Sequence, residues 1–124
     1  MLEKFLDSLK YDADGLVPAV VQDAENGDVL MVAYMNRESV AKTLTTGRTC
    51  FWSRSRQKFW IKGESSGNIQ AVKSVYVDCD KDCFVVKVEQ TGAACHEGYR
   101  TCFFRQVDGE GNETVVLERL SEAY

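Results

Sequence analysis

The chain lacks the features that mark exported and membrane-spanning proteins. No apolar run in its 124 residues approaches the roughly 20 residues that a membrane-spanning helix needs. Its first twenty residues carry Glu3, Asp7, Asp12 and Asp14, which neither a secretory signal nor a mitochondrial transit peptide tolerates. We therefore expect a cytoplasmic protein that has no membrane partner.

Internal repeats and low-complexity tracts are also absent, and histidine occurs once, as His96. A chain of this length with 44% hydrophobic residues can bury one modest core, so we expect a single domain over residues 1–124. Its five cysteines are expected to be reduced thiols, because an odd number cannot pair fully within one chain and the cytosol opposes disulfides. We expect these thiols to bind a metal ion rather than to form disulfides.

Charge is distributed unevenly along the chain. The formal net charge is −4, from 15 basic and 19 acidic residues. Residues 48–62 nevertheless hold five basic side chains, four large aromatic ones and no acidic one. An acidic protein with one basic, aromatic segment fits a small phosphorylated ligand that bears a ring better than it fits a long nucleic acid. A solvated amphipathic hairpin explains this segment equally well.

Hydrophobic spacing predicts short helices and many extended segments. Residues 2–10 have helical spacing, and a helix over 37–46 is flanked by Asn36 as an N-cap and Gly47 as a terminator. Alternation predicts strands over residues 16–22, 29–35, 49–55, 58–62, 69–79, 83–89, 101–107 and 114–120. The expected fold class is α+β, mostly antiparallel sheet with one or two short helices.

The most informative pattern combines thiols, carboxylates and the histidine: Cys79, Cys95, His96 and Cys102, with Asp78, Asp80 and Asp82 around the first cysteine. Thiolates are soft ligands that suit Zn²⁺, whereas carboxylates are hard ligands that suit Mg²⁺, so the pattern predicts two metal sites side by side. If the acidic segment is extended, alternation sends the aspartates to one face and Cys79 to the other. Three thiolates leave a fourth tetrahedral position open, as in catalytic zinc sites, where a bound water ionises near neutral pH.

Other interpretations of these residues stay open. Cys83 follows Cys79 by four positions, so four cysteines could instead close a purely structural zinc site. The aspartates could be a solvated hairpin tip, and Cys50 is expected to be a structural thiol. The small polar loop 63–68 offers backbone N–H groups and hydroxyls to a phosphate, although its composition favours an ordinary connection. A histidine beside a candidate zinc thiolate is a candidate for proton transfer.

Four blocks carry a resemblance to a known family: Trp52-Ser53-Arg54-Ser55-Arg56, Lys62-Gly63-Glu64-Ser65-Ser66-Gly67, Asp78-Cys79-Asp80-Lys81-Asp82, and the run from Glu89 to Phe103. In this order, between about Leu16 and Arg105, they closely resemble the phosphoribosyl-AMP cyclohydrolase family of histidine biosynthesis. Two positions depart from the family pattern. Asn68 stands where histidine is expected, which puts any role of position 68 in doubt, and Ala93-Ala94 replaces a pair that often includes proline.

The resemblance implies an intertwined homodimer with shared active sites. It implies Zn²⁺ ligands at Cys79, Cys95 and Cys102, contributed across the dimer interface, and Mg²⁺ ligands at Asp78, Asp80 and Asp82. Cys83 lies outside this set. The implied reaction is hydrolytic opening of the purine ring of phosphoribosyl-AMP between N1 and C6, with zinc-activated water and with His96 moving a proton to N1. For the two phosphate groups of this substrate, the available contacts are Arg54, Arg56, Lys62 and the Ser65-Ser66-Gly67 backbone. Trp52 either stacks on the base or packs in the core, and Glu64 is a second acid/base candidate.

Two competing functions remain. One is a zinc-stapled module that grips RNA through the basic aromatic hairpin, which predicts salt-sensitive polyanion binding and loss of metal in Cys83→Ser. The other is a deaminase of adenine nucleotides, which shares attack at C6, although the His-x-Glu and Cys-x-x-Cys pattern of the cytidine-deaminase type is absent. Because the chain ends at Tyr124, we expect a single-function enzyme without the pyrophosphohydrolase domain that some relatives carry.

Overall fold

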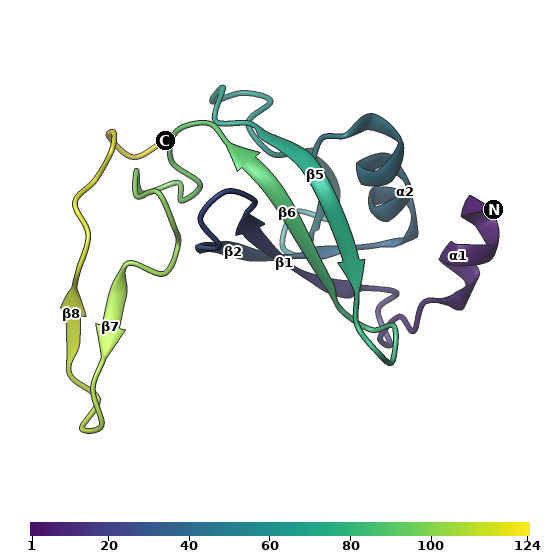
Figure 1. The fold of residues 1–124 in the computed structure, drawn as a ribbon, viewed down its shortest axis with the longest axis horizontal. Coiled ribbons are helices and arrows are strands. Elements are labelled where there is room, and N and C mark those ends of the chain that lie inside the picture. Colours follow the sequence, from purple (N-terminus) through teal and green to yellow (C-terminus); the bar gives the residue numbers. More distant parts are fainter.

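The computed structural model describes residues 1–124 and contains two helices and eight strands. In chain order these elements are α1 (Leu2–Ser8), β1 (Val17–Asp23), β2 (Val29–Met35), α2 (Arg37–Thr46), β3 (Cys50–Ser53), β4 (Lys58–Ile61), β5 (Gln70–Val77), β6 (Phe84–Gln90), β7 (Arg105–Val107) and β8 (Glu113–Val115). A four-stranded sheet of order β2-β1-β6-β5 forms the centre, and β3-β4 and β7-β8 are two separate hairpins (Figure 1).

The α+β class, the two short helices and the mostly antiparallel pairing agree with the prediction, and the central sheet is mixed because it contains one parallel pair. Strand β1 pairs antiparallel with β2 and parallel with β6, and β6 pairs antiparallel with β5. A parallel pair needs a long crossover, which the chain from β2 to β5 supplies here. Alternation within a strand reports which face is buried and not the direction of a distant partner, so the sequence pattern could not reveal this pairing.

Helix α2 begins and ends where its caps predict. The Asn36 side chain accepts a hydrogen bond from the Ser39 N–H (2.9 Å), the Ser39 hydroxyl accepts one from the Asn36 N–H (2.8 Å), and Gly47 ends the helix with φ of +74°. On the buried side, the Thr43 hydroxyl oxygen accepts from the Cys50 N–H (3.0 Å). Helix α2 thereby fixes the start of β3, and with it the basic hairpin β3-β4.

The core lies between the sheet, the two helices and the hairpin β3-β4. Fourteen buried residues form it, among them Val17, Val21, Val86 and Val88 from the sheet and Phe51 from β3. Phe51 is fully buried and packs on Trp60 of β4, with 4.9 Å between the ring centroids. Burial of a phenylalanine is worth about 1.5–3 kcal/mol, so this contact anchors the hairpin to the sheet.

The hairpin β7-β8 stands apart from the central sheet (Figure 1). This hairpin and its flanks leave large apolar side chains exposed: Phe103, Val107, Val115, Val116, Leu117 and Leu120 are each 42–61% exposed. A gathering of exposed apolar side chains on this scale is typical of a surface that binds another protein chain. Separately, neither helix is long and apolar enough to cross a membrane.

Candidate functional site

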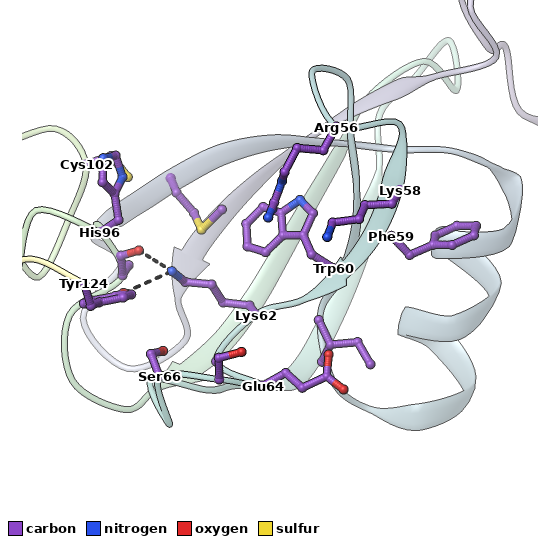
Figure 2. Close-up of a pocket in the computed structure, with 15 residues that line it drawn as sticks. Arg56, Lys58, Phe59, Trp60, Lys62, Glu64, Ser66, His96, Cys102 and Tyr124 are labelled. Carbon is purple, nitrogen blue, oxygen red and sulfur yellow. Dashed lines mark hydrogen bonds between the residues drawn. The ribbon is translucent and has the colours of Figure 1, made fainter.

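A cleft of about 640 Å³ opens between the hairpin β3-β4 with its following loop and the loop of residues 93–102 (Figure 2). Its lining residues are Met31, Arg56, Lys58, Phe59, Trp60, Ile61, Lys62, Gly63, Glu64, Ser65, Ser66, Ala94, His96, Cys102 and Tyr124. Three of these side chains are basic and one is acidic, so the cleft carries positive charge within a chain that is negative overall. Such a cleft attracts small anions.

The structure brings seven of the residues singled out from the sequence into this cleft: Arg56, Lys62, Glu64, Ser65, Ser66, His96 and Cys102. Trp52 and Arg54 lie elsewhere, in a separate hollow beside Asn36. The Arg54 guanidinium stacks on the Tyr34 ring at 3.9 Å, and the half-buried Trp52 packs against Phe59 at 5.0 Å between centroids. Gly67 is exposed and does not line the cleft.

The loop after β4 is shaped by close backbone contacts. Gly63 has φ of +82°, and a methyl group there would lie 2.5 Å from the backbone of both Asn68 and Ile69. The Gly67 N–H donates to the Gly63 carbonyl oxygen (2.8 Å) and closes the turn. The exposed serine hydroxyls between these two glycines therefore face solvent at the cleft, where a phosphate oxygen can accept a hydrogen bond from them.

Lys62 lies deepest among the basic residues of the cleft. It is 6% exposed, and its ammonium donates to the Ala94 carbonyl oxygen and to the Tyr124 hydroxyl (3.2 Å). No carboxylate forms an ion pair with it. Tyr124 and Met31, which also line the cleft, were missed from the sequence because they lie outside every motif, and no pattern there signals them.

The loop of residues 93–102 is held against the start of β2. The Cys102 N–H donates to the Leu30 carbonyl oxygen (2.8 Å), and the Thr101 hydroxyl donates to the Val29 carbonyl oxygen (2.7 Å). Within the loop, the Cys95 N–H donates to the Tyr99 carbonyl oxygen (3.1 Å), which closes a tight turn. These hydrogen bonds fix the backbone of the loop that carries Cys95 and Cys102.

The side chains of Cys95 and Cys102 lie near each other. Cys95 is 4% exposed, whereas Cys102 is exposed at the cleft. Partial desolvation, and then the neighbouring Cys95 thiol, raise the pKa of Cys102 to about 11, although the nearby Lys62 ammonium acts in the opposite direction. Two neighbouring thiols are suited to bind a soft metal ion, because the ion replaces their protons. The exposed His96 imidazole lies beside this pair, at the cleft.

The aspartate cluster lies in the turn between β5 and β6. Ligand atoms of Asp78, Asp80 and Asp82 all lie within 4.8 Å of one another. The segment is a turn rather than a strand, with Lys81 at φ of +63°, so the expected alternation of the aspartates and Cys79 between two faces is wrong. The turn itself gathers the carboxylates, since the Asp82 N–H donates to the Asp78 carboxylate (2.9 Å).

The short distances between these carboxylates perturb their pKa values. A hydrogen bond to Asp78, and then one to Asp80, raises the pKa of Asp82 to about 6, while the Asp82 backbone N–H lowers the pKa of Asp78. Three exposed carboxylates at such short range repel one another when ionised, and a hard divalent cation relieves that repulsion. The donor set of this turn therefore suits a hard divalent cation, whereas thiols such as those of Cys95 and Cys102 suit a soft one.

One chain does not bring all three candidate zinc ligands together. The exposed Cys79 lies in the turn before β6, whereas Cys95 and Cys102 lie in the loop after it, so the two places are at opposite ends of that strand (Figure 1). Cys83, beside the turn, is half-buried, and burial raises its pKa. The buried Cys50 behaves as a structural thiol, also with its pKa raised by burial.

An ion pair fastens the 93–102 loop to the sheet from the other side. The Arg100 guanidinium pairs with the Asp23 carboxylate at the end of β1, whose side chain is 8% exposed. Burial alone would raise the pKa of Asp23, but the N–H groups of Asn26 and Glu25 and the Arg100 charge outweigh it and lower the pKa. The pair therefore fixes the loop that carries the thiols.

Comparisons with a family model and with individual proteins point to the same family. A model of the phosphoribosyl-AMP cyclohydrolase family matches residues 31–104. A phosphoribosyl-AMP cyclohydrolase of Pelotomaculum thermopropionicum is 64% identical over 114 residues, which cover 92% of this chain and 88% of the relative. A protein of the same name from Ruegeria pomeroyi is 55% identical over 113 residues, which cover 91% of this chain and 94% of the relative.

Proposed function

The chain belongs to the phosphoribosyl-AMP cyclohydrolase family and is a hydrolase of histidine biosynthesis, and we propose that it opens the purine ring of phosphoribosyl-AMP in the cleft described above, with two chains completing each site. One observation carries this proposal. Cys102, the lone His96 and the buried Lys62 line a single basic cleft, with Cys95 buried near Cys102, and Lys62 comes from a segment far from the others in the sequence. That arrangement combines a zinc site, a proton carrier and an anion site.

The cleft provides contacts for a substrate with two phosphate groups. Arg56 and the hydroxyls of Ser65 and Ser66 lie toward its exposed side, where they suit a phosphate. Lys62 lies next to the thiol pair, and its third N–H is free for the substrate. Glu64 is a second acid/base candidate at the same cleft. Trp52, Arg54 and Gly67 lie outside the cleft of one chain and contribute only if a second chain faces them.

Zinc binding accounts for the spacing of the cysteines. We assign Cys95 and Cys102 of one chain and Cys79 of the second chain as its ligands, and Asp78, Asp80 and Asp82, which flank Cys79, as ligands of Mg²⁺. When bound, zinc supplies a Lewis acid that makes a water nucleophilic near neutral pH. Cys83 is not needed in this set, and its half-buried thiol lies apart from the cleft.

The reaction consumes one water, whose oxygen ends on C6 of the purine while the N1–C6 bond breaks. The departing N1 must gain a proton, and His96 is the titratable imidazole at the cleft that can carry it. Lys62 places a positive charge at the cleft, where it attracts the anionic substrate in its ground state and throughout the reaction. His96 and Lys62 both line the cleft that Cys102 also lines.

The need for a second chain has support on the surface of the molecule. The exposed apolar side chains of the hairpin β7-β8 and its flanks make a surface suited to association with another copy. A homodimer repeats every contact by symmetry, so a Cys79 turn delivered to one partner's cleft is matched by one delivered in return. Two equivalent sites result.

The proposal is tested by turnover of phosphoribosyl-AMP, followed by the absorbance change on ring opening, in metal-stripped protein with and without zinc. We expect zinc-dependent opening. His96→Ala should bind zinc normally but lose about 10²–10⁴-fold in turnover, the range typical of general acid/base groups. No turnover by a folded, zinc-loaded dimer would contradict the proposal, and full activity in His96→Ala would remove the histidine from the mechanism.

A further inference from the structure

Residues 116–124, which we call the strap, lie against the loop of residues 93–102. The Tyr124 N–H donates to the His96 carbonyl oxygen (2.7 Å), so the strap is hydrogen-bonded to the proposed catalytic residue itself. Gly98 has φ of +92°, and a methyl group there would lie 2.2 Å from the Ser121 carbonyl oxygen. The strap can pass this close only because position 98 is glycine.

The strap delivers one side chain into the cleft, that of Tyr124 (Figure 2). Its hydroxyl donates to the Ala93 carbonyl oxygen (2.7 Å) and accepts from the Lys62 ammonium (3.2 Å). A phenol has a single proton, and because that proton is committed to Ala93, an oxygen lone pair faces Lys62. The donor and the acceptor are therefore fixed in both hydrogen bonds of the Tyr124 hydroxyl.

Lys62 depends on this acceptor because it is a buried cation without a carboxylate partner. A buried ammonium is costly unless its N–H groups are hydrogen-bonded. The Ala94 carbonyl oxygen takes one N–H and the Tyr124 oxygen takes a second, which leaves the third for the cleft. Without the Tyr124 oxygen, the flexible lysine side chain gains freedom to turn away from this position.

We propose that Tyr124 is a positioning residue for the reaction, which holds the Lys62 ammonium in place at the cleft through its hydroxyl. This inference rests on the proposed function, in which Lys62 binds the anionic substrate. Tyr124 lies beyond residues 31–104, the part of the chain that matches the family model, so the assignment comes from the geometry of the strap and its hydrogen bonds.

The test measures kcat and KM for Tyr124→Phe, Lys62→Met and the double variant. Tyr124→Phe keeps the ring and removes only the oxygen, and loss of a hydrogen bond to a charged group should raise KM roughly tenfold with little change in kcat. In the Lys62→Met background the same substitution should change KM less than about twofold, because the two residues act as one unit. Tyr76→Phe is the matched control, since Tyr76 is 54% exposed on β5 and does not line the cleft.

Two outcomes would overturn the inference. One is an unchanged KM in Tyr124→Phe, and the other is an equal rise with and without the lysine, which a merely structural role predicts. If the wild-type protein fails to open phosphoribosyl-AMP, the proposed function fails instead. The inference is then decided by the rate at which acetic anhydride acetylates Lys62, measured by mass spectrometry. Acetylation should be severalfold faster in Tyr124→Phe, and an unchanged rate refutes the positioning role.

Discussion

Gly63 and Gly67 form a matched pair in the loop that borders the cleft. Both adopt left-handed backbone conformations, with φ of +82° and +81°. A methyl group at Gly63 would lie 2.5 Å from the backbone of Asn68 and Ile69, whereas a methyl group at Gly67 would meet nothing within 4 Å. Alanine at the two positions therefore carries similar backbone strain, and only Gly63→Ala adds a collision.

The expected destabilisation follows from these two contributions. An alanine in the left-handed region costs about 1–2 kcal/mol, so Gly67→Ala should lower the free energy of unfolding by that amount. Gly63→Ala should cost about 1–3 kcal/mol more, the usual range for overpacking, because the colliding atoms belong to the backbone and cannot rotate away. If the loop moves instead, the serines between the glycines shift with it, and the KM for phosphoribosyl-AMP rises.

Urea unfolding followed by tryptophan fluorescence measures the first effect, with both variants at one protein concentration, since association of chains changes apparent stability. Initial rates over a range of substrate concentrations measure the second. Gly67→Ala should keep its KM within about threefold, because a left-handed alanine that meets no neighbour leaves the loop in place. Equal free energies of unfolding together with equal KM values for the two variants would refute the argument from backbone contact.

Two further predictions concern the metal and the ion pair. Zinc content measured by mass spectrometry after dialysis should be unchanged in Cys83→Ser and lost in Cys95→Ser, and loss in Cys83→Ser would instead indicate a closed four-cysteine site. Arg100→Ala should lower the free energy of unfolding by about 1–3 kcal/mol at pH 7, because the Asp23 carboxylate stays buried without its partner. Since folding lowers the pKa of Asp23, the stabilisation by this pair is fully present above about pH 4 and lost as the pH falls through the folded-state pKa. Urea unfolding from pH 7 to pH 3 should therefore show the effect of Arg100→Ala shrinking, and an effect independent of pH would argue against this assignment.

Local signals in the sequence predicted much of the fold. Helix α2 and strand β2 have the bounds that were expected, because a capping residue, a terminal glycine and a regular apolar pattern all act within a few residues. The parallel pairing of β1 with β6 depends on strands that lie some sixty positions apart, and no local pattern carries that information. The short strands β7 and β8 have few buried contacts in one chain, so alternation overestimated their length.

The candidate site was predictable in part. His96, Cys102 and Lys62, which were selected from the sequence motifs, do line one cleft. They could be selected because few residue types can bind a metal ion, transfer a proton or bind an anion. Trp52 and Arg54 belong to the same motif segment as Arg56 but line a separate hollow, because Arg54 stacks on Tyr34 and Trp52 packs against Phe59, contacts that no local pattern reveals. Tyr124 reaches the cleft through the strap, a tertiary contact that depends on the close passage at Gly98 rather than on any local pattern.

The central claim, that each active site combines cysteines from two chains, is tested most directly by mixing inactive variants. Cys79→Ser and Cys102→Ser should each be inactive alone, because every site in either homodimer lacks one ligand. Co-expressed, they should form mixed dimers in which one of two sites is intact, giving roughly a quarter of wild-type activity if chains pair at random. Activity that stays at the level of the separate variants would contradict a shared site.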